Sequence, residues 1–204
     1  MNYIIIDTET TGLPDRKTGT WPKIISIAVL HTAITENDEM EIYSEDEYYI
    51  LDWVEELSDE TSKFLNLDKD TVRKRGINFE IVKNKIYKLI KECGGYENLT
   101  FVAHNVRFDY NVLKTCGLDL SSYKWFCTMK NGQLCLNQSK YPKLSELAKF
   151  YNICIDDDKL HGALYDTQIC ANVLYCIKTN NFNTCVKDVR LLELRNRSVE
   201  IYLE

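Results

Sequence analysis

The sequence predicts a layered protein of the α/β or mixed α+β class, in which strands and helices alternate along the chain. Short apolar runs of strand length recur, beginning with residues 3–6, and amphipathic segments of helix length separate several of them. The 204 residues suffice for one full-sized domain, with little left for a second. A composition of 45% hydrophobic and 27% charged residues is typical of a globular protein and excludes general disorder.

Each expected element follows from its local pattern. The strands are runs rich in apolar or β-branched residues, at 3–9, 24–30, 39–51, 99–103 and 125–129. The helices, most of them with apolar side chains three or four positions apart, are expected at 59–76, 78–92, 107–116, 144–151 and 162–178. Asp68 and Asp70 provide a helix start signal inside the first of these. We expect one domain over residues 1–178 and an appendage of unknown role over residues 179–204.

Charge and cysteine content narrow the class of protein. The net charge of −6 argues against a wide, non-specific grip on duplex nucleic acid, although it is compatible with binding a single strand end. The eight cysteines form no Cys-x-x-Cys pair and are expected to be reduced, mostly packed thiols. No run is long enough to span a bilayer, and the chain opens with a strand rather than a signal peptide. We therefore expect a cytoplasmic protein without a membrane partner.

Asp7 and Glu9 end the first strand and should point to the same side of the sheet, because side chains alternate along a strand. The two carboxylates would then lie roughly 7 Å apart at the edge of an apolar core. Two like charges in that place need a bridging cation or a proton. Carboxylate oxygens are the ligands that hard divalent metal ions prefer, so the pair predicts a metal site.

Asp109 and Asp166 lie on the apolar stripes of the helices expected at 107–116 and 162–178. An unpaired buried charge costs several kcal/mol, whereas a nearby helix N-terminus offers only about 0.3–1 kcal/mol. Taken singly, Asp109 could be a partner of the helix dipole, and Asp166 could be a solvated residue. A metal centre shared with Asp7 and Glu9 would account for all four carboxylates together.

The three histidines are expected to play different parts. His31 ends a strand in a polar stretch, which indicates a surface residue. His104 follows a strand directly, which favours a backbone-bonding role in a turn. His161 stands just before the helix that carries Asp166, where it is well placed to act as a general base.

Three segments in order carry the strongest signal: IIIDTETTGL at residues 4–13, VAHNVRFD at 102–109 and HGALYD at 161–166. They resemble the three motifs of the DEDDh (DnaQ-like) 3′→5′ exonucleases, the family that includes proofreading epsilon subunits of bacterial replicative polymerases. The third segment has the His-x4-Asp spacing of the histidine branch, whereas the tyrosine branch would need a tyrosine at the position of Gly162. The resemblance covers about residues 1–178.

The resemblance implies a ribonuclease-H-like fold, with a mixed sheet of about five strands flanked by helices. It also implies that Asp7, Glu9, Asp109 and Asp166 hold two Mg²⁺ or Mn²⁺ ions. His161 would take a proton from the attacking water, and nucleoside 5′-monophosphates would be released from single-stranded or frayed 3′ ends, with DNA the favoured substrate. The residues expected to bind the 3′-terminal nucleotide are Thr10, Thr11, Gly12, Leu13, Asn105 and Phe108.

Two alternative functions stay open beside this hypothesis, and a third, an integrase-like or ribonuclease-H-type endonuclease, is disfavoured by the His-x4-Asp spacing and the Thr-Gly-Leu segment. The enzyme could act on RNA or short oligonucleotides, since nothing in the sequence shows how a 2′-hydroxyl would be read. It could be a binding or proofreading subunit with a DNA polymerase as partner, although all five expected catalytic positions are intact. Residues 133–136 faintly resemble a sliding-clamp-binding peptide, but a loop with buried apolar residues is favoured there. Alternating apolar residues at 192–203 predict a hairpin or a docking strand.

Overall fold

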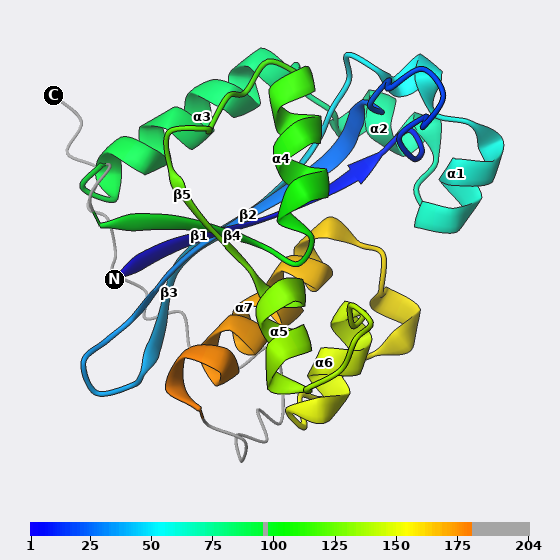
Figure 1. Ribbon diagram of the computed structural model, residues 1–204. Coiled ribbons are helices and arrows are strands. Elements are labelled where there is room, and N and C mark those ends of the chain that lie inside the picture. Colours follow the sequence, from blue (N-terminus) through cyan, green and yellow to red (C-terminus); the bar gives the residue numbers. More distant parts are fainter. Residues whose placement is uncertain (96–97, 181–204) are drawn as a thin grey trace, which may run out of the picture.

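A mixed five-stranded sheet forms the centre of the protein, which is described by a computed structural model over residues 1–95 and 98–180 (Figure 1). The strand order is β3-β2-β1-β4-β5. β1 pairs antiparallel with β2 and β2 with β3, whereas β1–β4 and β4–β5 are parallel. The strands are β1 (Asn2–Thr10), β2 (Ile24–Ile34), β3 (Met40–Tyr49), β4 (Leu99–Ala103) and β5 (Lys124–Cys127). The expected mixed sheet of five strands is confirmed.

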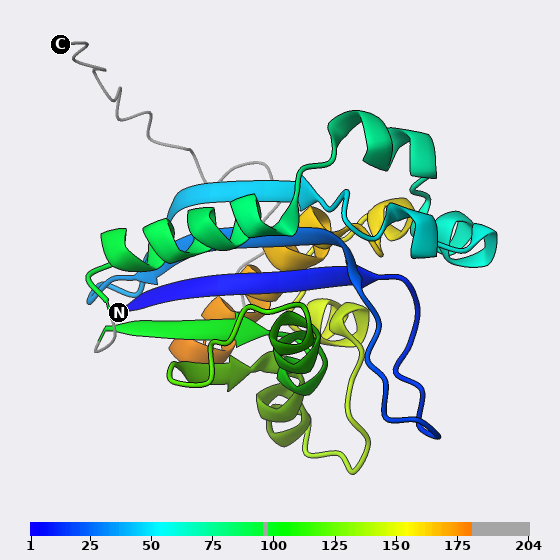
Figure 2. The same ribbon diagram turned by 90° about the horizontal axis from the view of Figure 1, so that it is seen from above.

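Helices cover both faces of this sheet, which explains why the central strand is apolar on both sides. Ile4, Ile5 and Ile6 of β1 are each fully buried. Ile4 and Ile6 pack in one cluster with α3 and α4, while Ile5 packs in another with α6 and α7. In Figure 2, α3 lies in front of the sheet and α7 behind it. A strand covered on both faces reads as a continuous apolar run rather than an alternating one.

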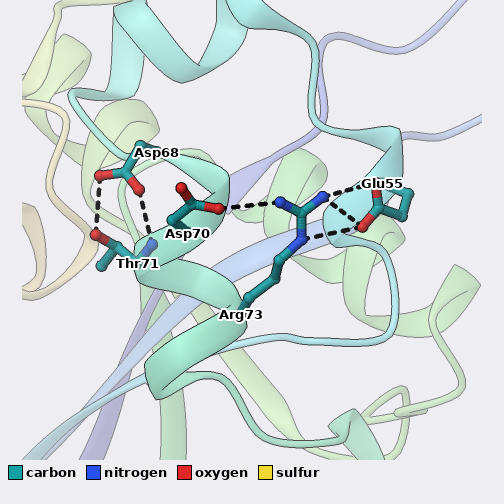
Figure 3. Close-up of polar contacts among 5 residues, drawn as sticks. All are labelled: Glu55, Asp68, Asp70, Thr71 and Arg73. Carbon is teal, nitrogen blue, oxygen red and sulfur yellow. Dashed lines mark hydrogen bonds and ion pairs between the residues drawn. The ribbon is translucent and has the colours of Figure 1, made fainter.

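The helices mostly match the sequence pattern, with one split. They are η1 (Val54–Glu56), α1 (Asp59–Leu65), α2 (Lys69–Arg75), α3 (Phe79–Glu92), α4 (Val106–Thr115), α5 (Thr128–Cys135), α6 (Leu144–Phe150), η2 (Asp157–Lys159) and α7 (Ala163–Thr179). The segment expected as one helix at 59–76 is two, because Asn66 takes the left-handed conformation (φ 49°) and ends α1. Asp68 caps α2 as its start signal predicted, accepting a hydrogen bond from the Thr71 N–H at 2.7 Å (Figure 3).

Residues 133–136 were expected to be a loop with buried apolar residues, and this prediction is wrong. They belong to the end of α5 and the residue that caps it, and the Leu134 side chain is 76% exposed. The strand expected at 125–129 ends earlier, at Cys127, because α5 begins at Thr128.

His31 is not the surface residue that its polar neighbourhood indicated. Its ring is half-buried, and Nε2 lies 3.3 Å from Asn2 Oδ1 and 3.2 Å from Cys93 Sγ. Burial lowers the pKa of His31. Its neighbours Asn2 of β1 and Cys93 after α3 lie far away in the sequence, so the chain gives no local sign that this ring faces a covered side of the sheet.

The structure bears on the predicted appendage and on the predicted reduced cysteines only in part, because it describes residues 1–95 and 98–180. α7 runs through Thr179, and residues 181–204, which include the alternating segment at 192–203, lie outside the described residues. None of the seven cysteines in the described part forms a disulfide; Cys93 and Cys170 are buried, whereas Cys135 and Cys154 are exposed. Within residues 1–95 and 98–180, no helix combines the length and the apolar character needed to cross a membrane.

Candidate active site

Three carboxylates meet where β1 runs past the end of its parallel partner. β1 pairs with β4 only as far as Ile5, and Asp7 and Glu9 follow on the part of the strand that is paired with β2 alone. The first turn of α7 brings Asp166 to the same place. Oxygen atoms of Asp7, Glu9 and Asp166 all lie within 4.8 Å of one another. The structure thus brings Asp7, Glu9 and Asp166 together at the end of the central strand.

Asp109 joins this cluster from the first turn of α4 and is only 4% exposed. Its Oδ1 accepts hydrogen bonds from the Thr8 backbone N–H at 3.2 Å and from the Thr8 hydroxyl at 2.9 Å. The Asp109 carboxylate is close enough to Asp7 to raise the pKa of that residue. Thr8, between the two acidic residues of β1, thus fixes the fourth carboxylate, a role that the sequence did not indicate.

Burial raises the pKa of all four carboxylates, and repulsion from neighbouring carboxylates adds to this at Asp7 and Glu9. Burial raises the pKa of Asp7 well above its usual range, and the neighbouring carboxylates raise it further. For the same first reason, the pKa of Glu9 rises to about 8, that of Asp109 to about 7 and that of Asp166 to about 6. A group of carboxylates that resists ionisation at neutral pH needs protons or a cation to become stable.

The donor set fits a hard divalent cation. In the described part of the chain, Asp166 Oδ1 is the one buried side-chain nitrogen or oxygen without a hydrogen-bond partner. A buried acceptor without a donor costs free energy, and a metal ion would satisfy it. Carboxylate oxygens alone are the ligand type of Mg²⁺ and Mn²⁺ sites. These residues therefore suit the ions that the sequence led us to expect.

His161 lies beside Asp166, in the loop between η2 and α7. Its backbone is in the left-handed region (φ 66°), and its side chain is exposed. The protonated form of its ring and a hydrogen bond from its backbone N–H each favour the charged carboxylate and counteract the burial that raises the pKa of Asp166. The imidazole packs against the ring of Phe64, with ring centroids 4.7 Å apart. The histidine is thus next to the carboxylates and open to solvent.

A cavity of about 450 Å³ adjoins these residues. Glu9 lies on one wall, His161 and the start of α7 on another, and residues 65–67 on a third. Its lining includes Glu47 of β3, which the sequence did not single out. Ser26 Oγ and the Tyr49 hydroxyl donate to Glu47 at 3.2 and 3.3 Å, and the Glu47 charge contributes to the raised pKa of Glu9. Only the alternation along β3, which puts Glu47 and Tyr49 on one face, could have indicated it.

The loop after β1 uses its hydroxyl groups to hold its own shape. The Thr10 hydroxyl donates to the Gly12 carbonyl at 2.7 Å, and the Thr11 hydroxyl accepts from the Lys23 N–H at 3.1 Å. A side chain added at Gly12 would meet nothing within 4 Å, so the space there is open. Leu13 is 85% exposed. The loop thus presents Leu13 and an unobstructed backbone to solvent.

The two remaining expected contact residues differ in exposure. Asn105 is exposed, and its carbonyl accepts from the N–H groups of Phe108 and Asp109 at the start of α4. Phe108 is half-buried against the core and its ring centroid lies 6.2 Å from that of Trp21. The structure therefore brings Asn105 to the surface near Asp109, while much of Phe108 is used in packing.

Most of the chain, including all the residues of this site, matches a known protein family. A model of the exonuclease family that is named after RNase T matches residues 4–174. The chain belongs to this exonuclease family. The expected resemblance to the DEDDh, DnaQ-like exonucleases is confirmed at the level of the family.

Sequence relatives of this exonuclease domain include enzymes of different size. It is 27% identical over 192 residues to Ribonuclease T of Buchnera aphidicola subsp. Baizongia pistaciae, covering 89% of this chain and 85% of that protein. It is 26% identical over 190 residues to the PolC-type DNA polymerase III of Ureaplasma parvum serovar 3, covering 89% of this chain. The match spans only 12% of the length of that polymerase.

Solved structures of exonucleases have the same fold. The nuclease domain of 3′hExo, a DEDDh family member bound to rAMP, superposes with a TM-score of 0.70 at 19% identity, covering 88% of this chain and 92% of that domain. An E. coli ExoI–ssDNA complex superposes with a TM-score of 0.63 at 16% identity, covering 87% of this chain and 40% of that one. The expected ribonuclease-H-like fold of the exonuclease domain is confirmed.

Proposed function

We propose that this chain is a divalent-metal-dependent 3′→5′ exonuclease that releases nucleoside 5′-monophosphates from single-stranded or frayed 3′ ends. The observation that carries the proposal is the meeting of Asp7, Glu9 and Asp166 oxygens within 4.8 Å, with buried Asp109 beside them. Glu9 of this cluster and the neighbouring His161 line a cavity in a domain of the exonuclease family. A concave site with perturbed carboxylates is where hydrolytic chemistry is expected.

In this proposal Asp7, Glu9, Asp109 and Asp166 would hold Mg²⁺ or Mn²⁺. Such ions, when bound, stabilise the negative charge on the attacking and leaving oxygens of a phosphodiester displacement. The protein's own part is to bring four oxygen donors together and to keep them buried. Buried carboxylates without a cation repel one another with little screening by solvent. Binding of positive ions relieves this repulsion, so the site would favour them.

His161 would be the general base. Its exposed imidazole beside Asp166 takes a proton from the water that attacks the terminal phosphorus. The bond between phosphorus and the 3′ oxygen of the preceding nucleotide then breaks, and the released nucleotide keeps its 5′ phosphate. The shortened strand leaves with a 3′ hydroxyl after that oxygen gains a proton.

The 3′-terminal nucleotide would lie against the loop at residues 10–13. The open space at Gly12 allows the strand to approach the backbone, and the exposed Leu13 side chain offers an apolar surface to the last base. Asn105 is the residue just before α4, whose first turn carries Asp109, and its side-chain amide would be available to the nucleotide. Phe108 would contribute mainly by supporting Trp21 behind this loop.

DNA is the substrate proposed, and RNA is the alternative. One similar structure is an ExoI–ssDNA complex, whereas others are bound to rAMP or recognise a histone mRNA stem-loop. The relative named Ribonuclease T favours RNA, and the PolC-type relative favours DNA and a polymerase as partner. The acidic net charge of −6 supports a grip on the strand end rather than on a long duplex.

A strand-degradation assay tests the proposal. Single-stranded DNA and RNA of one sequence, each with a 5′ label, are incubated with the protein and Mn²⁺ or EDTA. We expect a ladder that shortens from the 3′ end with Mn²⁺ and is absent with EDTA or with Asp7→Asn. His161→Ala should slow release by roughly 10²–10⁴-fold.

Two controls make the assay specific. Asp38→Asn replaces an exposed carboxylate in the β2–β3 turn, at a left-handed position (φ 56°) that asparagine tolerates, and should retain the wild-type rate. A circular single-stranded DNA should not be cut. Cutting of the circle would contradict an exonuclease, and a ladder that persists in EDTA would contradict the metal requirement.

A further inference from the structure

The ring of Phe64 on α1 contacts the ring of His161, which lines the cavity. The ring centroids are 4.7 Å apart and the planes are inclined by 39°. Phe64 is 63% exposed, so this side chain is not used to build the core. Offset and tilted ring pairs at such distances attract each other beyond their apolar burial. The contact joins an otherwise exposed aromatic residue to the residue proposed as general base.

α1 is held in a fixed place, so Phe64 can serve as a support. The Thr61 hydroxyl donates to the Thr11 carbonyl in the loop after β1 at 3.4 Å, and Ser58 caps the helix. Leu65, the next residue after Phe64, is buried. α1 is thus attached at one end to the loop proposed to bind the 3′ nucleotide and at the other to the cavity wall.

The elements on both sides of α1 are also tied to each other. Arg73 of α2 makes paired hydrogen bonds to Glu55 of η1, at 2.7 and 3.2 Å, and a further one to Asp70 (Figure 3). α1 lies in the chain between η1 and α2. The bridge therefore links the elements on the two sides of α1, the helix that carries Phe64.

Apart from Phe64, the His161 imidazole interacts with the charge of Asp166. Among residues 1–95 and 98–180, its ring makes no hydrogen bond to another side chain, and Phe64 is the one aromatic ring in contact with it. Its backbone is fixed by its left-handed conformation and by the bond to Asp166, but the side-chain torsions of an exposed residue are otherwise free.

We propose that Phe64 is a positioning residue, whose ring holds the His161 imidazole beside Asp166 in the lining of the cavity. The inference rests on the proposed function, because it assigns Phe64 to the general base of that reaction. A side chain that is already oriented needs no ordering when the substrate arrives, and this raises the rate of the chemical step. From the usual strength of a ring pair, we expect an effect of about three- to tenfold on kcat.

An NMR measurement tests the contact without any substrate. The chain has three histidines, so their ring protons are few, and His161→Ala assigns those of His161. We expect the ring current of Phe64 to displace the His161 signals in the wild type. Phe64→Leu, which keeps an apolar side chain without a ring, should remove the displacement, and Phe64→Tyr should retain it. Tyr87→Ala, an exposed aromatic residue on α3, serves as the matched control.

Kinetics on a single-stranded oligonucleotide with Mn²⁺ then separates positioning from substrate contact. Phe64→Leu should lower kcat three- to tenfold with KM unchanged, and Phe64→Tyr should restore kcat. In the His161→Ala background, Phe64→Leu should change nothing further. A raised KM, or a loss that persists without His161, would show that Phe64 contacts the strand instead and would overturn the inference.

The two experiments distinguish failure of the inference from failure of the proposed function. If the wild type degrades a strand but the His161 signals are not displaced by Phe64, the positioning role alone is wrong. If the displacement is present but no strand is degraded under any metal condition, the exonuclease proposal has failed, and the positioning role fails with it.

Discussion

Thr8 and Asp109 are 101 positions apart in the chain, yet two hydrogen bonds to the same oxygen join them. The backbone N–H and the hydroxyl of Thr8 donate to Asp109 Oδ1 at 3.2 and 2.9 Å. Both bonds favour the charged carboxylate and lower the pKa of Asp109 against the larger effect of burial. The residue between the two acidic residues of β1 therefore controls how readily the fourth carboxylate ionises.

Thr8→Val should weaken the response to metal ions, because it removes the hydroxyl donor while keeping a β-branched side chain of similar shape. Losing a hydrogen bond to a buried charged group costs about 1.5–3 kcal/mol, so Asp109 becomes harder to ionise. We expect half-maximal activity to require at least tenfold more Mn²⁺. A Mn²⁺ titration of nucleotide release measures this. Thr8→Ser keeps the donor and should behave as the wild type; an unchanged titration in Thr8→Val would contradict the role.

The stability of the metal-free protein should fall as pH rises from 6.5 to 8.5. Folding raises the pKa of Glu9 to about 8 and that of Asp109 to about 7, so the folded state binds more protons than the unfolded state in this window. Unfolding then becomes easier as these protons are lost. The measurement is the Tm in EDTA at several pH values. Asp7→Asn should flatten the decline and raise Tm at pH 8.5, by about 2–4 °C for each kcal/mol of relieved repulsion. A flat wild-type profile would contradict the argument.

Metal ions should reverse this decline. Added Mn²⁺ should raise the Tm of the wild type most at high pH, where the carboxylates have lost their protons, and should raise that of Asp7→Asn less. Asp38→Asn again serves as the control, and its profile should follow the wild type in EDTA and in Mn²⁺.

Much of the candidate site could be predicted from the sequence, because its residues break local patterns. Asp7 and Glu9 follow a continuous apolar strand, and Asp109 and Asp166 interrupt apolar helical stripes. A charge in such a position needs a partner wherever the rest of the chain goes. The geometry of Asp7, Glu9 and Asp166 therefore agrees with an argument that used only strand and helix periodicity.

The walls of the cavity could not be predicted in the same way. Glu47 comes near Glu9 because β3 pairs with β2 in one register, and Phe64 meets His161 because α1 and the loop before α7 lie side by side. Both depend on how distant segments are placed, and an exposed phenylalanine has no local signature of a role. The sequence did not predict α5, because Gly132 lowers the helix propensity of this segment. The helix is stabilised by packing rather than by propensity.

His104→Leu should destabilise the fold most at neutral pH. Nε2 donates to the Pro142 carbonyl at 3.1 Å, and Nδ1 accepts from the buried Thr128 hydroxyl at 3.1 Å, so the neutral ring joins β4 to the starts of α5 and α6. Leaving these partners unpaired costs roughly 1–3 kcal/mol. Burial lowers the pKa of His104 to about 4, so its contribution is present above pH 6.5 and is lost as pH falls toward 4. The Tm difference between wild type and variant should therefore shrink between pH 7 and pH 4.5, and a constant difference would contradict the assignment.

Gly132→Ala should destabilise the protein even though alanine favours helices. A Cβ atom at Gly132 would lie 2.5 Å from Cδ1 and Cδ2 of Leu147, a fully buried residue of α6. Alanine gains about 1 kcal/mol in helix propensity, whereas overpacking a core costs about 1–3 kcal/mol. We expect a net loss in urea unfolding, while Leu134→Ala on the exposed face of α5 should change stability by less than about 0.5 kcal/mol.

A second substitution tests whether the loss in Gly132→Ala comes from the contact with Leu147 or from a general sensitivity of α5 to substitution. Leu147→Ala in the wild type leaves a cavity and should cost about 2–5 kcal/mol. In the Gly132→Ala background the added methyl group occupies part of that space, so the same substitution should cost measurably less. If the two losses simply add, Gly132 does not set the distance between α5 and α6. If Gly132→Ala is stabilising, propensity rather than packing limits this helix.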